Sequence, residues 1–283
     1  MKNIAVVGAS GMLGKPVVKA LLAEGFTVTV IGRELNRLKA IFTENNVIHR
    51  QADVLSTRSL KQALLDVDAV HINLAGNSPK SCYENQVEGT RNILYVAKEL
   101  AIKRITYLSG TTSIKENSWH YDTDAKLKAE QLIKQSQIEY LIFCPSWFME
   151  TMPLFVDKGR ATVFGKTTQP IRWIAASDYA QMVATSYQQD KVLNQRLYIH
   201  GPQAIDMYTA LQAYCKKNST IKLGRMPYWF GNLIAKITKD PMIKDAVALL
   251  KYYEIVGEQG DPTVADNCFG KPQITIEQWV KSC

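Results

Sequence analysis

The sequence predicts an α/β fold in which helices cover a parallel sheet. Short apolar runs alternate with helical patterns over most of the first 200 residues, as expected when crossover helices connect parallel strands. Three glycines, at positions 8, 11 and 14, directly follow the first apolar run. The chain is 46% hydrophobic and 21% charged, a composition typical of a globular protein with a sizeable core. Together these observations indicate a doubly wound α/β domain.

Six strands and five helices are expected to alternate in this domain, in the Rossmann-type strand order 3-2-1-4-5-6. The strands are expected at 3–8, 27–33, 46–53, 67–76, 103–110 and 138–147, and the helices at 14–25, 34–42, 56–66, 85–101 and 122–137. The ligand of such a sheet lies at the carboxyl ends of strands one and four.

The rhythm changes after Pro145, and the text is mostly helical from about residue 202. We therefore expect a nucleotide-binding domain over 1–200, in which 146–170 contribute to the cleft. A smaller lobe over 201–283 is expected to contact a substrate or partner.

The net charge of +8 comes from scattered Lys and Arg residues, without a run of five or six. A phosphorylated small molecule explains this charge more simply than a nucleic acid, which is not expected as a partner. The cysteines have no CxxC pair, so neither a zinc site nor another metal site is expected, and free thiols in a cytoplasmic protein fit best. Monomer and dimer both stay open. The cysteines are Cys82, Cys144, Cys215, Cys268 and Cys283.

The glycine loop indicates dinucleotide binding. Gly8, Gly11 and Gly14 follow a predicted strand and open a predicted helix, so backbone N–H groups and the helix dipole can approach a pyrophosphate. The alternative is a glycine-rich turn that serves only close packing of helix on strand.

The end of the second strand favours NADP(H) over NAD(H). An acidic residue commonly binds the adenosine ribose there, whereas this chain has Arg33, whose guanidinium would pair with a 2′-phosphate. Arg37 either assists or is a solvated helix residue. Asp53 either accepts a hydrogen bond from the adenine amino group or caps the following helix.

Several segments in this order resemble the short-chain dehydrogenase/reductase superfamily, specifically its atypical and extended members. They are "GASGMLG", "ADV" at 52–54, "NLAG" at 73–76, "NQVEGTRNILYVAKELAIKRITYLSG" at 85–110 and "KLKAEQLI" at 126–133. The segments "CPSWFMETMP" and "WIAASDYAQMVATS" look like the NmrA-like branch and the related complex I subunit-like proteins. The resemblance covers about residues 1–200 and identifies no substrate.

The resemblance implies roles for four short segments along the cofactor. The pyrophosphate would be wrapped by Gly8, Ser10, Gly11, Met12 and Leu13, and the adenine flanked by Asp53 and Val54. The adenosine ribose would lie beside Leu74, Ala75 and Gly76, and the nicotinamide beside Pro145, Ser146 and Trp147.

Catalytic members of the superfamily use a YxxxK pair on one helix. Residues four apart share a helical face, so the ammonium lowers the pKa of the phenol while it holds the nicotinamide ribose. Lys126 matches this lysine, and Glu130 follows it by four as in the family. The position four before Lys126 is Asp122 instead of tyrosine, which puts the catalytic pair in doubt.

Tyr121 is the nearest phenol, five positions before Lys126. If the helix includes Tyr121, its side chain points about 100° away from the family position. If the helix begins at the cap formed by residue 122 or 123, Tyr121 lies in a loop and can swing in. The hydroxyl position after the fifth strand is matched by Thr111, with Ser109 just upstream.

Two functions follow from these residues. The first is an NADP(H)-dependent oxidoreductase for a small carbonyl or quinone, with Lys126 on the ribose and Tyr121 or Thr111 on the reacting oxygen. The alternative is a non-catalytic NADP(H) redox sensor that regulates a protein partner. The aromatic and basic segment 224–239 resembles a membrane-interface sequence, but we expect it to pack over the cleft, and attachment to a membrane surface is not expected.

Overall fold

The computed structural model describes residues 1–190, 192–217, 220–239 and 241–282, so Cys283 lies outside the described residues. The chain divides into two compact units, each of which is built from separate stretches of sequence. Unit 1 comprises Met1–Pro145, Ala176–Ile199 and Asp261–Lys271, and unit 2 comprises Ser146–Ala175, His200–Gly260 and Pro272–Cys283.

Unit 1 is built on a sheet of seven parallel strands in the order β10-β6-β5-β4-β1-β2-β3. The central strands are buried along their whole length, which explains why most of their residues are apolar. The order confirms the predicted doubly wound sheet and adds a seventh strand outside β6. The strands are β1 (Asn3–Val7), β2 (Thr27–Gly32), β3 (Val47–Gln51), β4 (Ala69–Ile72), β5 (Arg104–Leu108), β6 (Glu139–Pro145) and β10 (Gln195–Ile199).

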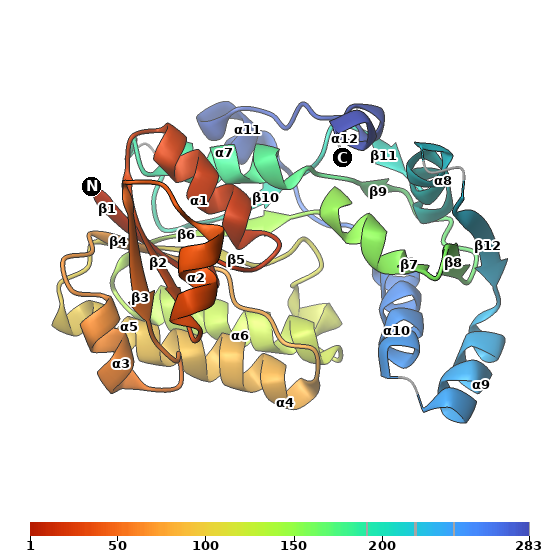
Figure 1. Ribbon diagram of the computed structural model, residues 1–283, viewed down its shortest axis with the longest axis horizontal. Coiled ribbons are helices and arrows are strands. Elements are labelled where there is room, and N and C mark those ends of the chain that lie inside the picture. Colours follow the sequence, from red (N-terminus) through yellow and green to blue (C-terminus); the bar gives the residue numbers. More distant parts are fainter. Residues whose placement is uncertain (191, 218–219, 240, 283) are drawn as a thin grey trace. The chain divides into compact units, whose positions relative to one another are not determined.

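Helices cover both faces of this sheet (Figure 1). Helices α1 and α7 lie side by side on one face, and α3, α5 and α6 pack in sequence on the other. The helices of unit 1 are α1 (Gly14–Ala23), α2 (Leu35–Ile41), α3 (Thr57–Ala63), α4 (Pro79–Cys82), α5 (Gly89–Glu99), α6 (Tyr121–Gln135), α7 (Ala176–Ser186) and α11 (Thr263–Phe269), with a short 3-10 turn at Lys115–Asn117.

The long helical stretch expected at 85–101 begins earlier than predicted. Its first turn is α4, which starts after Ser78, whose hydroxyl accepts a hydrogen bond from the Ser81 N–H. A π-helical segment, Tyr83–Glu88, connects α4 to α5. This segment is only six residues long, too short to have a periodicity of its own, so the sequence pattern does not predict it.

Unit 2 has its own apolar core, centred on the fully buried Trp173. Its strands pair in two small sheets: β7 (Val156–Asp157), β8 (Arg160–Phe164) and β12 (Lys222–Met226) form one, and β9 (Ile171–Arg172) and β11 (Ala204–Ile205) form the other. Its helices are the 3-10 segment Met149–Phe155, α8 (Met207–Lys217), α9 (Tyr228–Thr238), α10 (Pro241–Val256) and α12 (Ile276–Ser282).

The chain passes between the two units several times instead of dividing once at residue 200. Residues 146–175 supply β7, β8, β9 and Trp173 to the core of unit 2, while α11 packs against α7 and β10 of unit 1. Within the described ranges, no helix is long and apolar enough to cross a membrane.

Candidate dinucleotide-binding and catalytic site

Two glycines of the loop between β1 and α1 are required by close packing within the chain. Gly8 has a φ of +83°, and a Cβ atom there would lie 2.1 Å from the carbonyl oxygen of Asn73. A Cβ atom on Gly14 would lie 2.3 Å from the carbonyl oxygen of Gly8 and 2.7 Å from that of Ala9. Both positions therefore exclude any larger residue because the obstructing atoms belong to the backbone.

Gly11 differs from the other two glycines. It is exposed, and among the described residues a Cβ atom there would meet, within 4 Å, only the carbonyl oxygen of Gly8, at 3.2 Å. Ser10 and Leu13 are half-buried beside it, and Met12 is exposed. The loop is thus open at Gly11 and lies at the positive end of α1, whose first turn has no acidic residue. This open cradle fits a pyrophosphate.

Arg33 directly follows β2 and is exposed. Its carbonyl oxygen accepts a hydrogen bond of 2.8 Å from the Gln51 amide, which ties its backbone to the end of β3. Within the described part of the chain, no salt bridge engages its guanidinium. Arg37 is also exposed, on α2. The edge of the sheet beside the glycine loop therefore carries cationic side chains able to pair with an anion.

Asp53 and Val54 form the turn between β3 and α3. The Asp53 carboxylate accepts a hydrogen bond of 2.9 Å from the N–H of Leu55, while the cap of α3 is Ser56. The alternative that Asp53 caps this helix is therefore incorrect. The Val54 side chain lies beneath Gly89, where a Cβ atom would approach it to 2.9 Å.

Leu74, Ala75 and Gly76 follow β4 in a loop that packs closely on α4. A Cβ atom on Gly76 would lie 2.3 Å from the backbone nitrogen of Cys82. The carbonyl oxygen of Ala75 accepts a hydrogen bond of 2.8 Å from Asn85. This loop and the glycine loop meet through Gly8 and Asn73, at the carboxyl ends of β1 and β4, where the strand order predicts the ligand.

Lys126 forms an ion pair with Asp122, one helical turn before it on α6. The other carboxylate oxygen of Asp122 accepts a hydrogen bond of 2.8 Å from Gln86 in the π-helical segment. Burial disfavours the charged carboxylate, but the ammonium of Lys126 and the two hydrogen bonds outweigh it and hold the pKa of Asp122 below its usual value. The Lys126 side chain is only 17% exposed. Asp122 is therefore a fixed anion that orients Lys126.

Tyr121 lies inside α6, so the helix does not begin at residue 122 or 123. Its ring stacks on that of His120 at 4.8 Å and packs against the small cluster of Cys82, Val87 and Ala125. The phenol consequently points about 100° around the helix from the position four residues before Lys126. The tyrosine of the YxxxK pair is therefore absent, and Asp122 occupies the position four residues before Lys126.

The two hydroxyl residues after β5 are buried, and Ser109 belongs to a polar network. Ser109 donates a hydrogen bond of 2.6 Å to Glu130, which also pairs with Arg196 at 3.0 Å. The Thr111 N–H donates to the carbonyl oxygen of Pro145, the last residue of β6, at 3.1 Å, and its side chain is buried. Glu130, which matches the family motif, thus bonds Arg196 and Ser109.

Ser146 and Trp147 belong to unit 2. The Ser146 hydroxyl donates to the carbonyl oxygen of Arg172, and the Trp147 ring packs on Tyr253, with centroids 4.2 Å apart. Glu258 lies in the same region, where it accepts a hydrogen bond of 2.8 Å from the Arg172 N–H. Burial raises the pKa of Glu258 to about 7, against this hydrogen bond.

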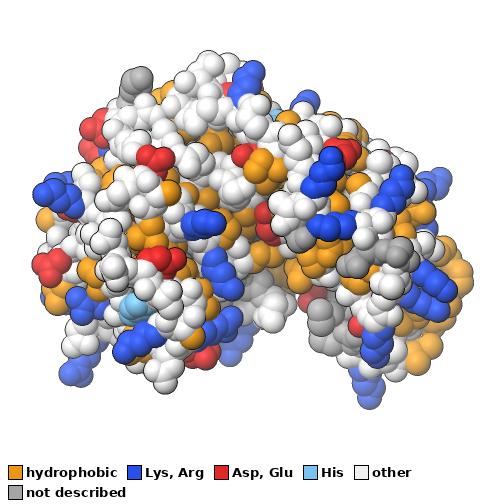
Figure 2. All heavy atoms as spheres, turned by 45° about the horizontal axis from the view of Figure 1, so that its top comes forward, with side chains coloured by type: hydrophobic (Ala, Val, Ile, Leu, Met, Phe, Trp, Pro, Cys, Tyr) orange, Lys and Arg blue, Asp and Glu red, His pale blue; other side chains and the backbone are white. Residues whose placement is uncertain are grey.

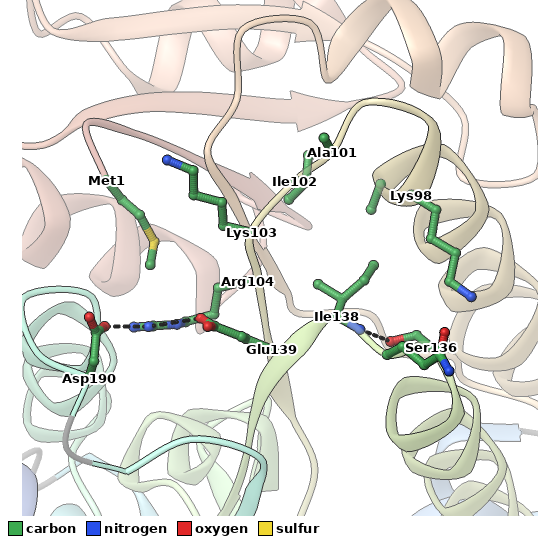
Figure 3. A pocket seen from close by; sticks show the side chains of 12 residues that line it. Met1, Lys98, Ala101, Ile102, Lys103, Arg104, Ser136, Ile138, Glu139 and Asp190 are labelled. Carbon is green, nitrogen blue, oxygen red and sulfur yellow. Dashed lines mark hydrogen bonds and ion pairs between the residues drawn. The ribbon is translucent and has the colours of Figure 1, made fainter.

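A separate hollow of about 720 Å³ lies at the amino ends of β5 and β6 (Figure 3). The glycine loop lies at the opposite ends of the strands, because it follows the carboxyl end of β1. Arg104, which is fully buried, donates hydrogen bonds at its edge to Asp190 at 2.5 Å and Glu139 at 3.2 Å. These two carboxylates and the Ser186 carbonyl oxygen, at 2.9 Å, bind the guanidinium as a structural group.

Sequence reasoning missed Gln86, Arg196 and Glu258 as members of these polar clusters. The partners of Arg196 and Gln86 lie 66 and 36 residues away in the chain, so no spacing rule connects them. The Asp122–Lys126 pair can be predicted from the sequence, because residues four apart on a helix lie next to each other.

Comparisons with known proteins agree with this fold. An E. coli NADPH-dependent quinone oxidoreductase, solved with NADPH, is 20% identical, with a TM-score of 0.79 and 99% of each chain covered. The triphenylmethane reductase of Citrobacter sp. is 17% identical, with a TM-score of 0.79 and 99% of this chain and 98% of that chain covered. Similarity at this level of identity shows the fold.

A sequence relative is the photosystem II assembly factor Ycf39 of Synechocystis sp., which is 24% identical over 210 residues, 71% of this chain and 63% of that protein. This chain therefore spans less than two thirds of that relative's length. The family model described as NAD(P)H-binding matches residues 8–190. This range includes the glycine loop, Lys126 and five strands of the sheet, whereas β1 precedes it and β10 follows it. The chain belongs to the NAD(P)H-binding family.

Proposed function

We propose that this protein is an NADP(H)-dependent reductase whose acceptor is a quinone or a related conjugated carbonyl. The observation that carries the proposal is the Asp122–Lys126 pair on α6, held by Gln86. Ordering and partly burying two long charged groups has a free-energy cost, which is reasonable where the cation has a positioning role. The resemblance of residues 126–133 to catalytic short-chain reductases implies that Lys126 holds the nicotinamide ribose.

The cofactor is supported by the open cradle at Gly11 and the exposed guanidinium of Arg33. Backbone N–H groups at the start of α1 would hold the pyrophosphate, and Arg33 the 2′-phosphate that distinguishes NADP(H). When bound, the reduced dinucleotide supplies a hydride. The residues of this chain bind and orient it and hold Lys126 in place.

The type of acceptor follows from the groups around Lys126. Asp122 has a lowered pKa and is ionised at neutral pH, so it cannot donate a proton. Tyr121 lies off the Lys126 face of α6, and the Ser109 hydroxyl donates its hydrogen bond to Glu130. The Thr111 side chain is buried. An isolated carbonyl needs a proton donor as its oxygen becomes anionic. A quinone delocalises that charge and takes its proton from water, so the site suits it better.

The test is oxidation of NADPH with simple quinones and with unconjugated aldehydes as separate acceptors. We expect turnover with quinones and about 100-fold lower kcat/KM in Lys126→Met, because the ammonium no longer orients the cofactor. Lys128→Met is the matched control, since Lys128 lies on the same helix and forms an exposed pair with Asp124. Equal loss in both variants, or turnover of aldehydes alone, contradicts the proposal.

The displaced phenol also favours a second function, a redox sensor that binds NADP(H) without consuming it. A sensor must bind oxidised and reduced cofactor in conformations that differ, because a ligand without differential affinity shifts no equilibrium. Amide hydrogen exchange of the protein with NADP+ and with NADPH measures this. Different exchange patterns without turnover of any quinone support the sensor, and identical patterns with quinone turnover exclude it.

A further inference from the structure

Helix α9 of unit 2 presents its large apolar side chains to solvent. Trp229 is 68% exposed, Phe230 39%, Leu233 42% and Ile237 72%. At about 100° per residue, these four side chains fall within an arc of about 100° on the helix surface. Within unit 2, Trp229 and Phe230 therefore face solvent.

The opposite side of α9 fixes the helix against its own unit. Gly231 is buried, and a Cβ atom there would lie 2.7 Å from the Phe164 ring and 2.8 Å from Val247. Tyr228 donates a hydrogen bond to Glu254 of α10. Because the backbone approaches its neighbours this closely, the helix cannot rotate to bury its apolar arc without losing these contacts.

The apolar arc is accompanied by positive charge. From Lys222 to Lys239 the chain has four basic residues and no acidic one. All four are exposed: Lys222 and Arg225 lie on β12, Lys236 in the last turn of α9 and Lys239 directly after that helix. On the face shown in Figure 2, hydrophobic and basic side chains gather over the part of unit 2 that carries α9. We call this combination the α9 surface.

We propose that the α9 surface binds the surface of an anionic lipid bilayer. Trp and Phe side chains are favoured at the boundary between headgroups and acyl chains, and an exposed apolar arc can enter it to a shallow depth. Lys236 lies at the margin of the apolar arc on α9 and Lys239 directly follows that helix, so these two cations can meet lipid phosphates beside it, and each exposed cation adds to the attraction. This role is independent of the dinucleotide site.

The charge argues against a second copy of the chain as the occupant. A symmetric contact through the α9 surface would bring two sets of four cations together without an acidic residue of the same segment between them. Like charges at an interface repel, and burial of the apolar arc would have to overcome that repulsion. An anionic bilayer instead satisfies both the apolar arc and the cations.

The test is sedimentation of the full chain with vesicles of phosphatidylcholine alone and of phosphatidylcholine mixed with phosphatidylglycerol. We expect binding to the mixed vesicles, loss of binding at high salt, and little binding to neutral vesicles. Leu233→Ser should weaken binding about tenfold, since it removes apolar area that enters the bilayer. Leu65→Ser is the matched control, because Leu65 is 48% exposed on unit 1 and should leave binding unchanged.

A second variant separates charge from apolar contact. Lys236 is exposed, and Lys236→Glu should lower binding to the anionic vesicles by about tenfold. The circular dichroism spectrum and the melting temperature should stay unchanged. Lack of binding by the unmodified protein overturns the proposal. So does gel filtration that shows a dimer which Leu233→Ser converts to a monomer, because the second copy is then the occupant.

Discussion

Two glycines of one loop should respond to the same substitution in opposite ways. In Gly14→Ala the new methyl group would lie 2.3 Å and 2.7 Å from two backbone oxygens, which cannot move without distorting β1 or α1. We expect the free energy of unfolding to fall by about 3 kcal/mol. In Gly11→Ala the methyl group would lie 3.2 Å from the Gly8 oxygen, so the expected loss is below about 1 kcal/mol.

The consequence for cofactor binding is the reverse. The methyl group of Gly11→Ala would stand where a pyrophosphate has to approach the loop, so we expect the Kd for NADPH to rise at least about tenfold. Urea unfolding measures the stability of both variants, and titration calorimetry measures NADPH binding by the folded protein. Unchanged NADPH affinity in Gly11→Ala, or unchanged stability in Gly14→Ala, refutes the reasoning.

Three further substitutions test other parts of the account. Arg33→Ala should weaken NADPH binding about tenfold and leave NADH binding unchanged, because only NADPH carries the 2′-phosphate; a calorimetric comparison that shows equal losses excludes this role. Asp122→Ala should lower the free energy of unfolding by about 1–2 kcal/mol, since it leaves the partly buried ammonium of Lys126 unpaired. Asp124→Ala, at an exposed position of the same helix, should change it by less than about 0.5 kcal/mol. Equal effects of the two substitutions in urea unfolding contradict the buried pair. The pKa of Glu258 rises in the fold from 4.5 to about 7, so the folded state binds the extra proton, and stability present below pH 4.5 is lost as the pH rises through 7. Burial lowers the pKa of His71 from 6.5 to about 3, so His71 changes the stability with pH in the opposite direction. The quantity to measure is therefore the difference in the free energy of unfolding between wild type and Glu258→Gln across this pH range. A difference that does not change with pH rules out the raised pKa.

The sheet of unit 1 could be predicted because its strands are buried on both faces. Mostly apolar strands such as Asn3–Val7 and Ala69–Ile72 alternate with helices, and right-handed crossovers leave few possible strand orders. Strand β12 of unit 2 could not be predicted in the same way. Its residues Lys222–Met226 are mostly exposed, so no apolar pattern distinguishes them from the helical text around them.

The start of α6 shows the limit of local signals at the site. The residues at 122 and 123 are good helix caps, and the sequence placed the helix start there. The structure begins the helix at Tyr121, after His120, whose side chain makes no capping hydrogen bond. Here the Asp122 carboxylate binds Lys126 and Gln86 instead of capping the helix, and the π-helical segment that supplies Gln86 has no sequence signature.

The most direct measurement is the rate at which the purified protein oxidises NADPH in the presence of a quinone. Lys126→Met and Lys128→Met are measured beside it, with cofactor affinity determined separately for each protein. The account predicts quinone-dependent oxidation that falls about 100-fold in kcat/KM in Lys126→Met and is unchanged in Lys128→Met. Tight NADPH binding without oxidation by any quinone would contradict the proposed reductase.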